Sequence, residues 1–135
     1  MNTRRVVVTG IGGITAFGRD WQSIQAAFKA EKNAVKYMDW RGRFPELEAQ
    51  LGAPIEGYAP PEHWTRKQLR SMGRVSHLCV DAAEQALTDA GLLGDESITD
   101  GRMGVACGSS VGSIKDIGDM GELLITGTSR NFNAN

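Results

Sequence analysis

The sequence predicts an α/β fold, because two short strand-like runs are each followed by a glycine-rich turn and then by a helical pattern. Arg5–Thr9 holds three consecutive valines and ends at Gly10, as a buried strand does. Met103–Cys107 is a short run of small residues that enters a second glycine turn. Open α/β sheets usually contain about four or more strands. Two strands therefore lead us to expect a fold that is incomplete in this chain.

Three segments carry helical signals. Asp20 is a candidate N-cap for a helix over Trp21–Lys32. The strongest pattern spans Thr65–Ala90, where apolar residues recur along one stripe and Gly91 offers a C-terminal stop. A last helix is expected after Ser113, which can cap it.

The segment between residues 33 and 63 has weaker signals, because prolines interrupt scattered apolar residues. We expect one short helix near Pro45–Gln50. The segment is too apolar for a disordered linker, so we place no internal boundary and treat residues 1–135 as one domain. Gly73, inside the strongest helical stretch, predicts a kink or a close helix crossing.

Composition excludes several classes of protein. Lys and Arg number 15 against 16 Asp and Glu, and a net charge of −1 argues against a general nucleic-acid binder. No apolar run approaches the ~18 residues needed to cross a bilayer, so no membrane partner is expected. The two cysteines have no metal-ligand spacing, and nothing in the sequence suggests an oxidising compartment. The expected location is the cytoplasm.

The first glycine loop differs from a dinucleotide fingerprint. Gly10 and Gly12 match the first two glycines of G-x-G-x-x-G, but Thr15 stands at the third. The loop is therefore more typical of a tight turn under close packing than of a nicotinamide or flavin site.

The second glycine turn, Gly108–Ser113, lacks the lysine of a phosphate-binding P-loop. Ser110 occupies the centre of a G-x-S-x-G pattern, but a hydrolase of that type needs a histidine later in the chain. His63 and His77 both precede it, so an esterase is not favoured. The two histidines have no metal-ligand spacing and are interpreted as structural or solvent-facing.

The two cysteines are assigned structural positions. Cys107 ends a predicted strand with no histidine or lysine near it in sequence, so it is not expected to be a nucleophile. Cys79 lies on the apolar stripe of the predicted long helix and is expected in the core.

A basic cluster is formed by Arg66, Lys67, Arg70 and Arg74, with no acidic residue between them. Residues 66, 70 and 74 are spaced i, i+4, i+8 and would share one face of a helix. Two interpretations stay open: a solvated face, or a docking surface for an acidic partner.

Four ordered motifs resemble one family. The opening Arg4–Thr15 is similar to the V-V-V-T-G-x-G start of the β-ketoacyl-[acyl-carrier-protein] synthases, in their elongating, thiolase-fold branch. The basic Thr65–Arg70 comes next, then Ala82–Leu92, similar to A-x-x-A-L-x-D-A-G-L, and Gly104–Gly112, similar to G-x-x-x-G-S-x-x-G. The resemblance covers nearly the whole chain. It implies the N-terminal portion of a layered α-β-α, thiolase-like fold.

The resemblance also implies an activity: decarboxylative Claisen condensation of acyl and malonyl thioesters carried by acyl carrier protein, in fatty-acid or polyketide synthesis. The family uses a cysteine thiolate and two histidines, needs no metal or bound cofactor, and is homodimeric at full length. Its nucleophile segment has no match here, so no catalytic residue is expected in this chain, which alone should be inactive.

By the same resemblance, Ser110, Val111 and Gly112 would help line the acyl pocket. Arg66, Lys67, Arg70 and Arg74 would form the docking edge for the carrier protein. Two alternatives remain: a non-catalytic ketosynthase-like partner subunit of the chain-length-factor type, and a Rossmann-type binding domain.

Overall fold

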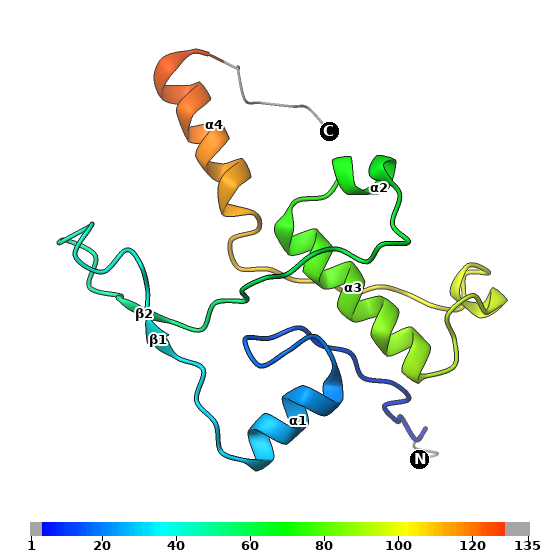
Figure 1. Ribbon diagram of the computed structural model, residues 1–135. Coiled ribbons are helices and arrows are strands. Elements are labelled where there is room, and N and C mark those ends of the chain that lie inside the picture. Colours follow the sequence, from blue (N-terminus) through cyan, green and yellow to red (C-terminus); the bar gives the residue numbers. More distant parts are fainter. Residues whose placement is uncertain (1–3, 129–135) are drawn as a thin grey trace. The chain divides into compact units, whose positions relative to one another are not determined.

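The computed structural model describes residues 4–128. Within this range the chain forms four α-helices, one 3₁₀ turn and a two-stranded sheet (Figure 1). In chain order they are α1 (Trp21–Lys29), β1 (Lys36–Tyr37), β2 (Leu51–Gly52), α2 (Arg66–Arg70), α3 (Arg74–Asp89), η1 (Glu96–Ile98) and α4 (Ile114–Thr126). No helix of the described range is both long and apolar enough to cross a membrane.

The chain divides into two compact units. The first comprises the residues up to Ala59 together with Ala82–Leu93, and the second comprises Pro60–Asp81 and the residues from Gly94 on. The division falls within α3, so each half of that helix belongs to a different unit. The single domain without an internal boundary stays a prediction.

In the first unit, α1 begins as the sequence predicts. The Asp20 carboxylate accepts hydrogen bonds from the backbone N–H (2.8 Å) and the hydroxyl (2.7 Å) of Ser23, which satisfies an otherwise open donor of the first turn. The helix ends at Lys29, earlier than expected. Ile24 and Ala27 are its buried residues, 2% and 6% exposed.

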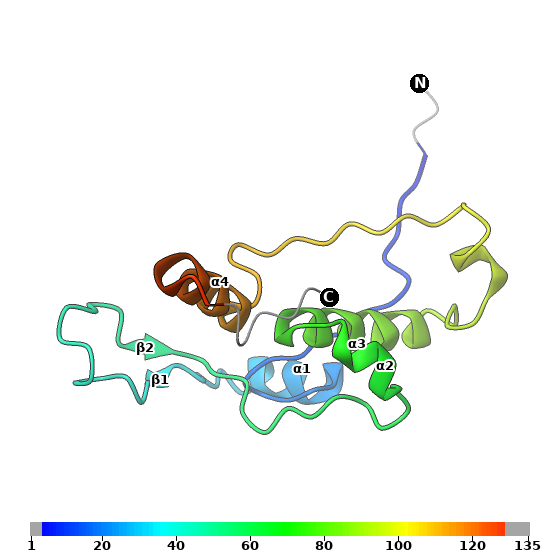
Figure 2. The ribbon, with the colours of Figure 1, turned by 90° about the horizontal axis from the view of Figure 1, so that it is seen from above.

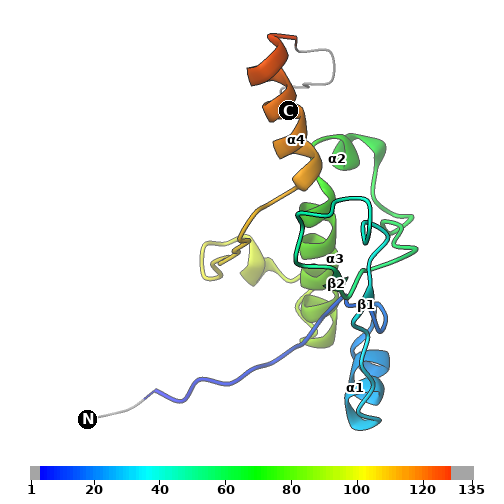
Figure 3. The same ribbon diagram turned by 90° about the vertical axis from the view of Figure 1, so that its left-hand side faces the viewer.

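The first glycine loop packs against the C-terminal half of α3 and lies beside it in Figures 1 and 3. A Cβ atom on Gly10 would lie 2.2 Å from the carbonyl oxygen of Ala86, and one on Gly12 would lie 2.2 Å from that of Ala82. Glycine is therefore required at both positions by close approach of two backbones. The prediction of a tight turn under close packing is confirmed.

The prediction of a short helix near Pro45–Gln50 is wrong. β1 and β2 pair antiparallel instead, with Lys36 opposite Gly52 and Tyr37 opposite Leu51. Beyond the strands, the Met38 N–H donates to the Gln50 carbonyl (3.0 Å), and the Trp40 indole N–H donates to the Ala49 carbonyl (3.0 Å). These hydrogen bonds join the two arms of the segment into a hairpin. Residues 45–50 therefore form no helix.

In the second unit, the predicted helix over Thr65–Ala90 is divided. α2 ends with Ser71 as its C-cap, and α3 starts at Arg74. A Cβ on Gly73 would lie 2.2 Å from Ser113 Oγ and 2.8 Å from Asp116 Oδ2. Gly73 lies in the break between α2 and α3, so the kink predicted as one of the two possibilities is confirmed, and residues at the start of α4 lie close to it.

The two predicted strands are absent as strands from the part of the chain that the structure describes. Arg5–Thr9 and Met103–Cys107 are irregular segments, or threads, without a neighbouring strand (Figure 2). Val6 and Val105 are 91% and 93% exposed. A strand is defined by the ladder of hydrogen bonds to its neighbour, and within residues 4–128 neither run has that neighbour.

The α4 helix follows Ser113 as predicted, although Ser113 makes no side-chain capping bond. Its apolar side chains are largely exposed, with Leu124 at 79% and Ile125 at 87%. Among the described residues nothing lies within 4 Å of a Cβ built on Gly118 or Gly121. This unit therefore leaves the apolar face of α4 uncovered.

Candidate functional site

The basic cluster is positioned by a capping box. Thr65 Oγ1 accepts the backbone N–H of Gln68 (3.3 Å), and Gln68 Oε1 accepts the backbone N–H of Thr65 (2.8 Å). The two reciprocal bonds fix where α2 begins. They therefore also fix the direction in which the following basic side chains leave the helix.

Three of the four basic residues lie on α2, and all four are exposed. Arg66 and Arg70 keep the i, i+4 relation, but Arg74 belongs to α3. The prediction that residues 66, 70 and 74 share one helix face is wrong, because α2 ends before Ser71 and a separate helix, α3, begins at Arg74. Within residues 4–128, no ion pair joins Arg66 or Lys67 to an acidic side chain.

A surface hollow of about 680 Å³ lies at this helix, lined by Lys67, Gln68, Arg70 and Ser71. Its wall carries two cations and two neutral hydrogen-bonding side chains. Such a surface attracts an anion or an acidic protein.

The second glycine turn is held by a local bond. Gly112 donates its N–H to Ser109 Oγ (2.9 Å) and has φ +75°, a conformation that favours glycine. Ser110 and Val111 are exposed, Val111 at 58%. Sequence reasoning did not give Ser109 this role, although the short spacing of serine and glycine is typical of such turns.

The segment that carries the basic cluster and the second glycine turn approach each other at one point of the second unit. Gly73, in the break between α2 and α3, contacts Ser113, the residue that follows Gly112. The structure therefore brings the break behind the basic cluster against the end of the second glycine turn.

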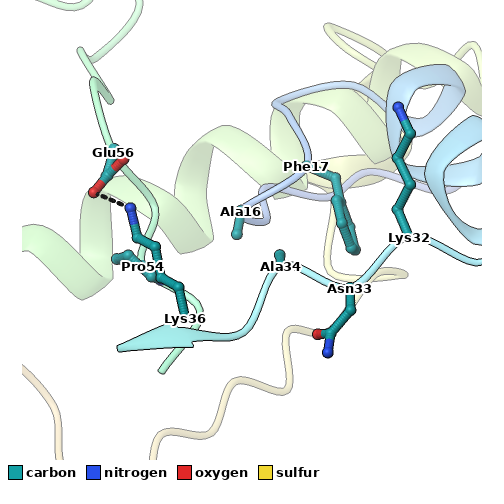
Figure 4. Close-up of a pocket in the computed structure, with 8 residues that line it drawn as sticks. All are labelled: Ala16, Phe17, Lys32, Asn33, Ala34, Lys36, Pro54 and Glu56. Atoms are coloured by element: carbon teal, nitrogen blue, oxygen red, sulfur yellow. Dashed lines mark hydrogen bonds and ion pairs between the residues drawn. The ribbon is translucent and has the colours of Figure 1, made fainter. Parts of the chain in front are cut away.

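A second hollow, of about 390 Å³, lies in the first unit (Figure 4). Lys36 and Glu56 form an ion pair across it at 2.7 Å, both side chains being more than half exposed. An exposed pair of this kind contributes ~0–1 kcal/mol to stability. The full lining is Ala16, Phe17, Lys32, Asn33, Ala34, Lys36, Pro54 and Glu56. Sequence reasoning missed this hollow because it depends on the hairpin.

The two histidines lie around a buried tryptophan. The rings of His63 and His77 are 6.3 and 6.0 Å from that of Trp64, whose side chain is only 6% exposed. Among residues 4–128 there is no group of three or more His, Cys, Asp or Glu side chains suited to a metal ion.

The expectation that Cys79 lies in the core is wrong. Both cysteines are exposed and free, and their sulfur atoms are 3.2 Å apart. Cys79 is on α3, whereas Cys107 is distant in sequence, so their contact arises from tertiary structure that no local sequence signal reveals.

Comparison with known proteins identifies the family of the chain. The family described as "Beta-ketoacyl synthase, N-terminal domain" matches residues 3–135. The chain belongs to the β-ketoacyl synthase family. The resemblance inferred from the four sequence motifs is confirmed.

Curated relatives of this β-ketoacyl synthase chain include 3-oxoacyl-[acyl-carrier-protein] synthase 2 of Synechocystis sp., 29% identical over 125 residues, or 93% of the chain. Nodulation protein E of Rhizobium leguminosarum bv. trifolii is 41% identical over 106 residues, or 78% of the chain. 3-Oxoacyl-[acyl-carrier-protein] synthase 1 of Haemophilus influenzae is 31% identical over 114 residues, or 82% of the chain. The matched regions span 30%, 25% and 26% of the lengths of these relatives.

A crystal structure of a β-ketoacyl synthase from Burkholderia phymatum STM815 is similar to the chain at 52% identity and a TM-score of 0.87. The similarity covers 98% of the chain and 33% of the solved one. The predicted fold class, the N-terminal part of a thiolase-like α/β fold, is confirmed.

Proposed function

We propose that this β-ketoacyl synthase chain is part of a 3-oxoacyl-[acyl-carrier-protein] synthase, which condenses acyl and malonyl thioesters with loss of CO₂ in fatty-acid or polyketide synthesis. The observation that carries the proposal is the family match over residues 3–135. Relatives named as 3-oxoacyl-[acyl-carrier-protein] synthases support it.

The chemistry of this reaction requires a cysteine thiolate that takes the acyl group and histidines that stabilise the thioester enolate. We assign no catalytic residue to this chain. Cys107 falls outside the family's nucleophile motif, and its sulfur contacts another thiol rather than a base. The chain alone should therefore form no acyl-enzyme, and no metal or bound cofactor is required.

The part we propose for this chain is recognition of the carrier protein. Acyl carrier proteins are acidic, and α2 presents Arg66, Lys67 and Arg70 to solvent, with Arg74 following at the start of α3. The net charge of −1 makes this cluster a local positive field on a nearly neutral chain. Such a field raises the association rate with an acidic partner more than it fixes the final pose.

We propose a second part, lining of the acyl pocket, for Ser110, Val111 and Gly112. These side chains are small, and the turn that holds them depends on the Ser109–Gly112 bond. The contact between Gly73 and Ser113 offers a short physical link from this turn to the break that follows the basic helix.

The proposed function predicts binding of acyl carrier protein to the chain through α2. Lys67→Glu should raise the dissociation constant several-fold, up to about tenfold. Reversing one charge at a partly solvated interface changes the binding free energy by ~1 kcal/mol. Isothermal titration at low and high salt measures it. At physiological salt the Debye length is about 8 Å, so the difference should shrink as salt rises.

The matched control is Lys32→Glu, which makes the same charge change at another exposed lysine, outside the basic cluster. Circular dichroism of both variants checks that the helices persist. Equal weakening by both substitutions, or affinities that ignore salt, would show that α2 is only a solvated face.

A Rossmann-type site receives no support from the first glycine loop. Its Ile11 N–H donates to Asp89 Oδ2 (2.9 Å) and its Gly13 N–H donates to Gln85 Oε1 (3.4 Å). Amides already used in this way cannot hold a pyrophosphate. The non-catalytic partner subunit stays as the alternative, and a glutamine at the nucleophile position of the whole protein would indicate it.

A further inference from the structure

We propose that Cys79 and Cys107 form a dithiol site that a small disulfide such as oxidised glutathione converts into an intrachain disulfide bond. The two sulfur atoms are 3.2 Å apart, and both residues are exposed. Both belong to the second unit, so their contact lies within one compact part of the chain. Neither thiol is used in the proposed condensation.

The geometry leaves a short distance to close. A disulfide needs the sulfurs about 2.05 Å apart, so the pair must approach by about 1 Å. Cys79 is held on α3, but Cys107 lies on the Met103–Cys107 thread, which is outside any strand pairing in the described chain. Among described residues, nothing lies within 4 Å of a Cβ built on Gly104 or Gly108. No described atom therefore packs against the thread at these two glycines.

The contact lets either sulfur resolve a mixed disulfide formed on the other, because the two are 3.2 Å apart. The thiolate is the nucleophile in such an exchange.

The exchange balances with one molecule of oxidised glutathione. The thiolate of one of the two cysteines attacks one glutathione sulfur, the glutathione S–S bond breaks, and the first glutathione leaves as a thiolate that takes up the proton lost by that cysteine. The other cysteine then loses its proton and attacks the protein sulfur of the mixed disulfide, forming the protein disulfide and releasing the second glutathione, which accepts that proton. The two cysteines give up two electrons, and the glutathione disulfide is reduced by two.

The bond would tie the thread to α3 immediately before the second glycine turn, since Cys107 is followed by Gly108. Its effect on the acyl pocket rests on the proposed function, because that role of Ser110–Gly112 is itself proposed. Formation of the bond does not depend on it.

The test is oxidation of the purified chain in glutathione buffers, followed by alkylation of remaining thiols, intact mass and tryptic mapping. We expect both thiols to be lost together, without added glutathione mass. No Lys or Arg lies between Arg74 and Arg102 or between Arg102 and Lys115. The bond should therefore join peptides 75–102 and 103–115, and reductant should separate them.

Two kinds of control keep the outcome decisive. Cys79→Ser and Cys107→Ser should each take up one glutathione, because the remaining thiol has no internal partner to resolve the mixed disulfide. In urea, the equilibrium constant for bond formation should fall by at least about tenfold, since the structure no longer holds the sulfurs in contact. Two glutathiones on the unmutated chain, disulfide-linked dimers, persistent thiols, or equal constants with and without urea would each overturn the proposal.

Discussion

Replacing Gly12 with alanine places a methyl group where the backbone of α3 already lies. The new Cβ would stand 2.2 Å from the Ala82 carbonyl oxygen and 2.7 Å from the Ala86 amide nitrogen. Both atoms belong to a helix, so they cannot swing aside as the end of a side chain can. The loop must retreat instead, and its hydrogen bonds to α3 lengthen.

The expected loss of stability follows from these terms. Overpacking costs ~1–3 kcal/mol, and each weakened hydrogen bond costs ~1 kcal/mol. Against this, alanine restricts the unfolded chain and recovers ~0.4–1 kcal/mol. With the bonds of Ile11 and Gly13 both weakened, the free energy of unfolding should therefore fall by about 2–4 kcal/mol in Gly12→Ala.

Urea unfolding followed by tryptophan fluorescence measures the change, and amide hydrogen exchange locates it. The N–H groups of Ile11 and Gly13, which donate to α3, should exchange faster in Gly12→Ala. Gly104→Ala is the matched control, because no described atom lies within 4 Å of its Cβ position and its φ is not positive. Equal stability of the two variants, with unchanged exchange at Ile11 and Gly13, would refute the close packing of the loop on α3.

Two further predictions concern the helix starts. Thr65→Ala should lower the free energy of unfolding by ~1 kcal/mol by opening the capping box with Gln68, whereas Thr65→Ser should retain most of it; equal losses on urea unfolding would contradict the cap. The hydrogen bonds from Ser23 hold the pKa of Asp20 below its ordinary value of 3.8. The capping contribution of Asp20 should therefore be complete above that value and disappear as pH falls through the lowered pKa. Titration of its carboxyl carbon by NMR tests this, and Ser23→Ala should move the pKa back up.

The helices could be predicted because their signals are local. The Asp20 side chain caps α1, and Gly91 at φ +69° ends α3, each within a few residues of the pattern that indicates it. The glycine loop could be interpreted as well, since paired glycines facing a small-residue helix favour close packing.

What failed depends on partners distant in sequence. The valine run and the Met103–Cys107 run have the composition of strands, but a strand also needs a neighbour that composition cannot supply. At the break before Arg74, Gly73 lies close to Ser113, a neighbour 40 positions away that no helical periodicity contains.

The candidate site divides in the same way. The charge of the basic cluster is visible in the sequence, whereas its arrangement on α2 and α3 depends on that break. The contact between Cys79 and Cys107 has no sequence signal at all, because the two residues are separated by 28 positions.

The uncovered valine run has a consequence for solubility. Val6, Val7 and Val8 are 91%, 61% and 81% exposed, and apolar residues of high β-propensity with open backbone groups are templates for edge-to-edge aggregation. Arg4 and Arg5 stand directly before them, and both are exposed. Charges in this position act as gatekeepers, because stacking such segments in register would bring like charges together. The arginine pair thus opposes self-association of the exposed valine run.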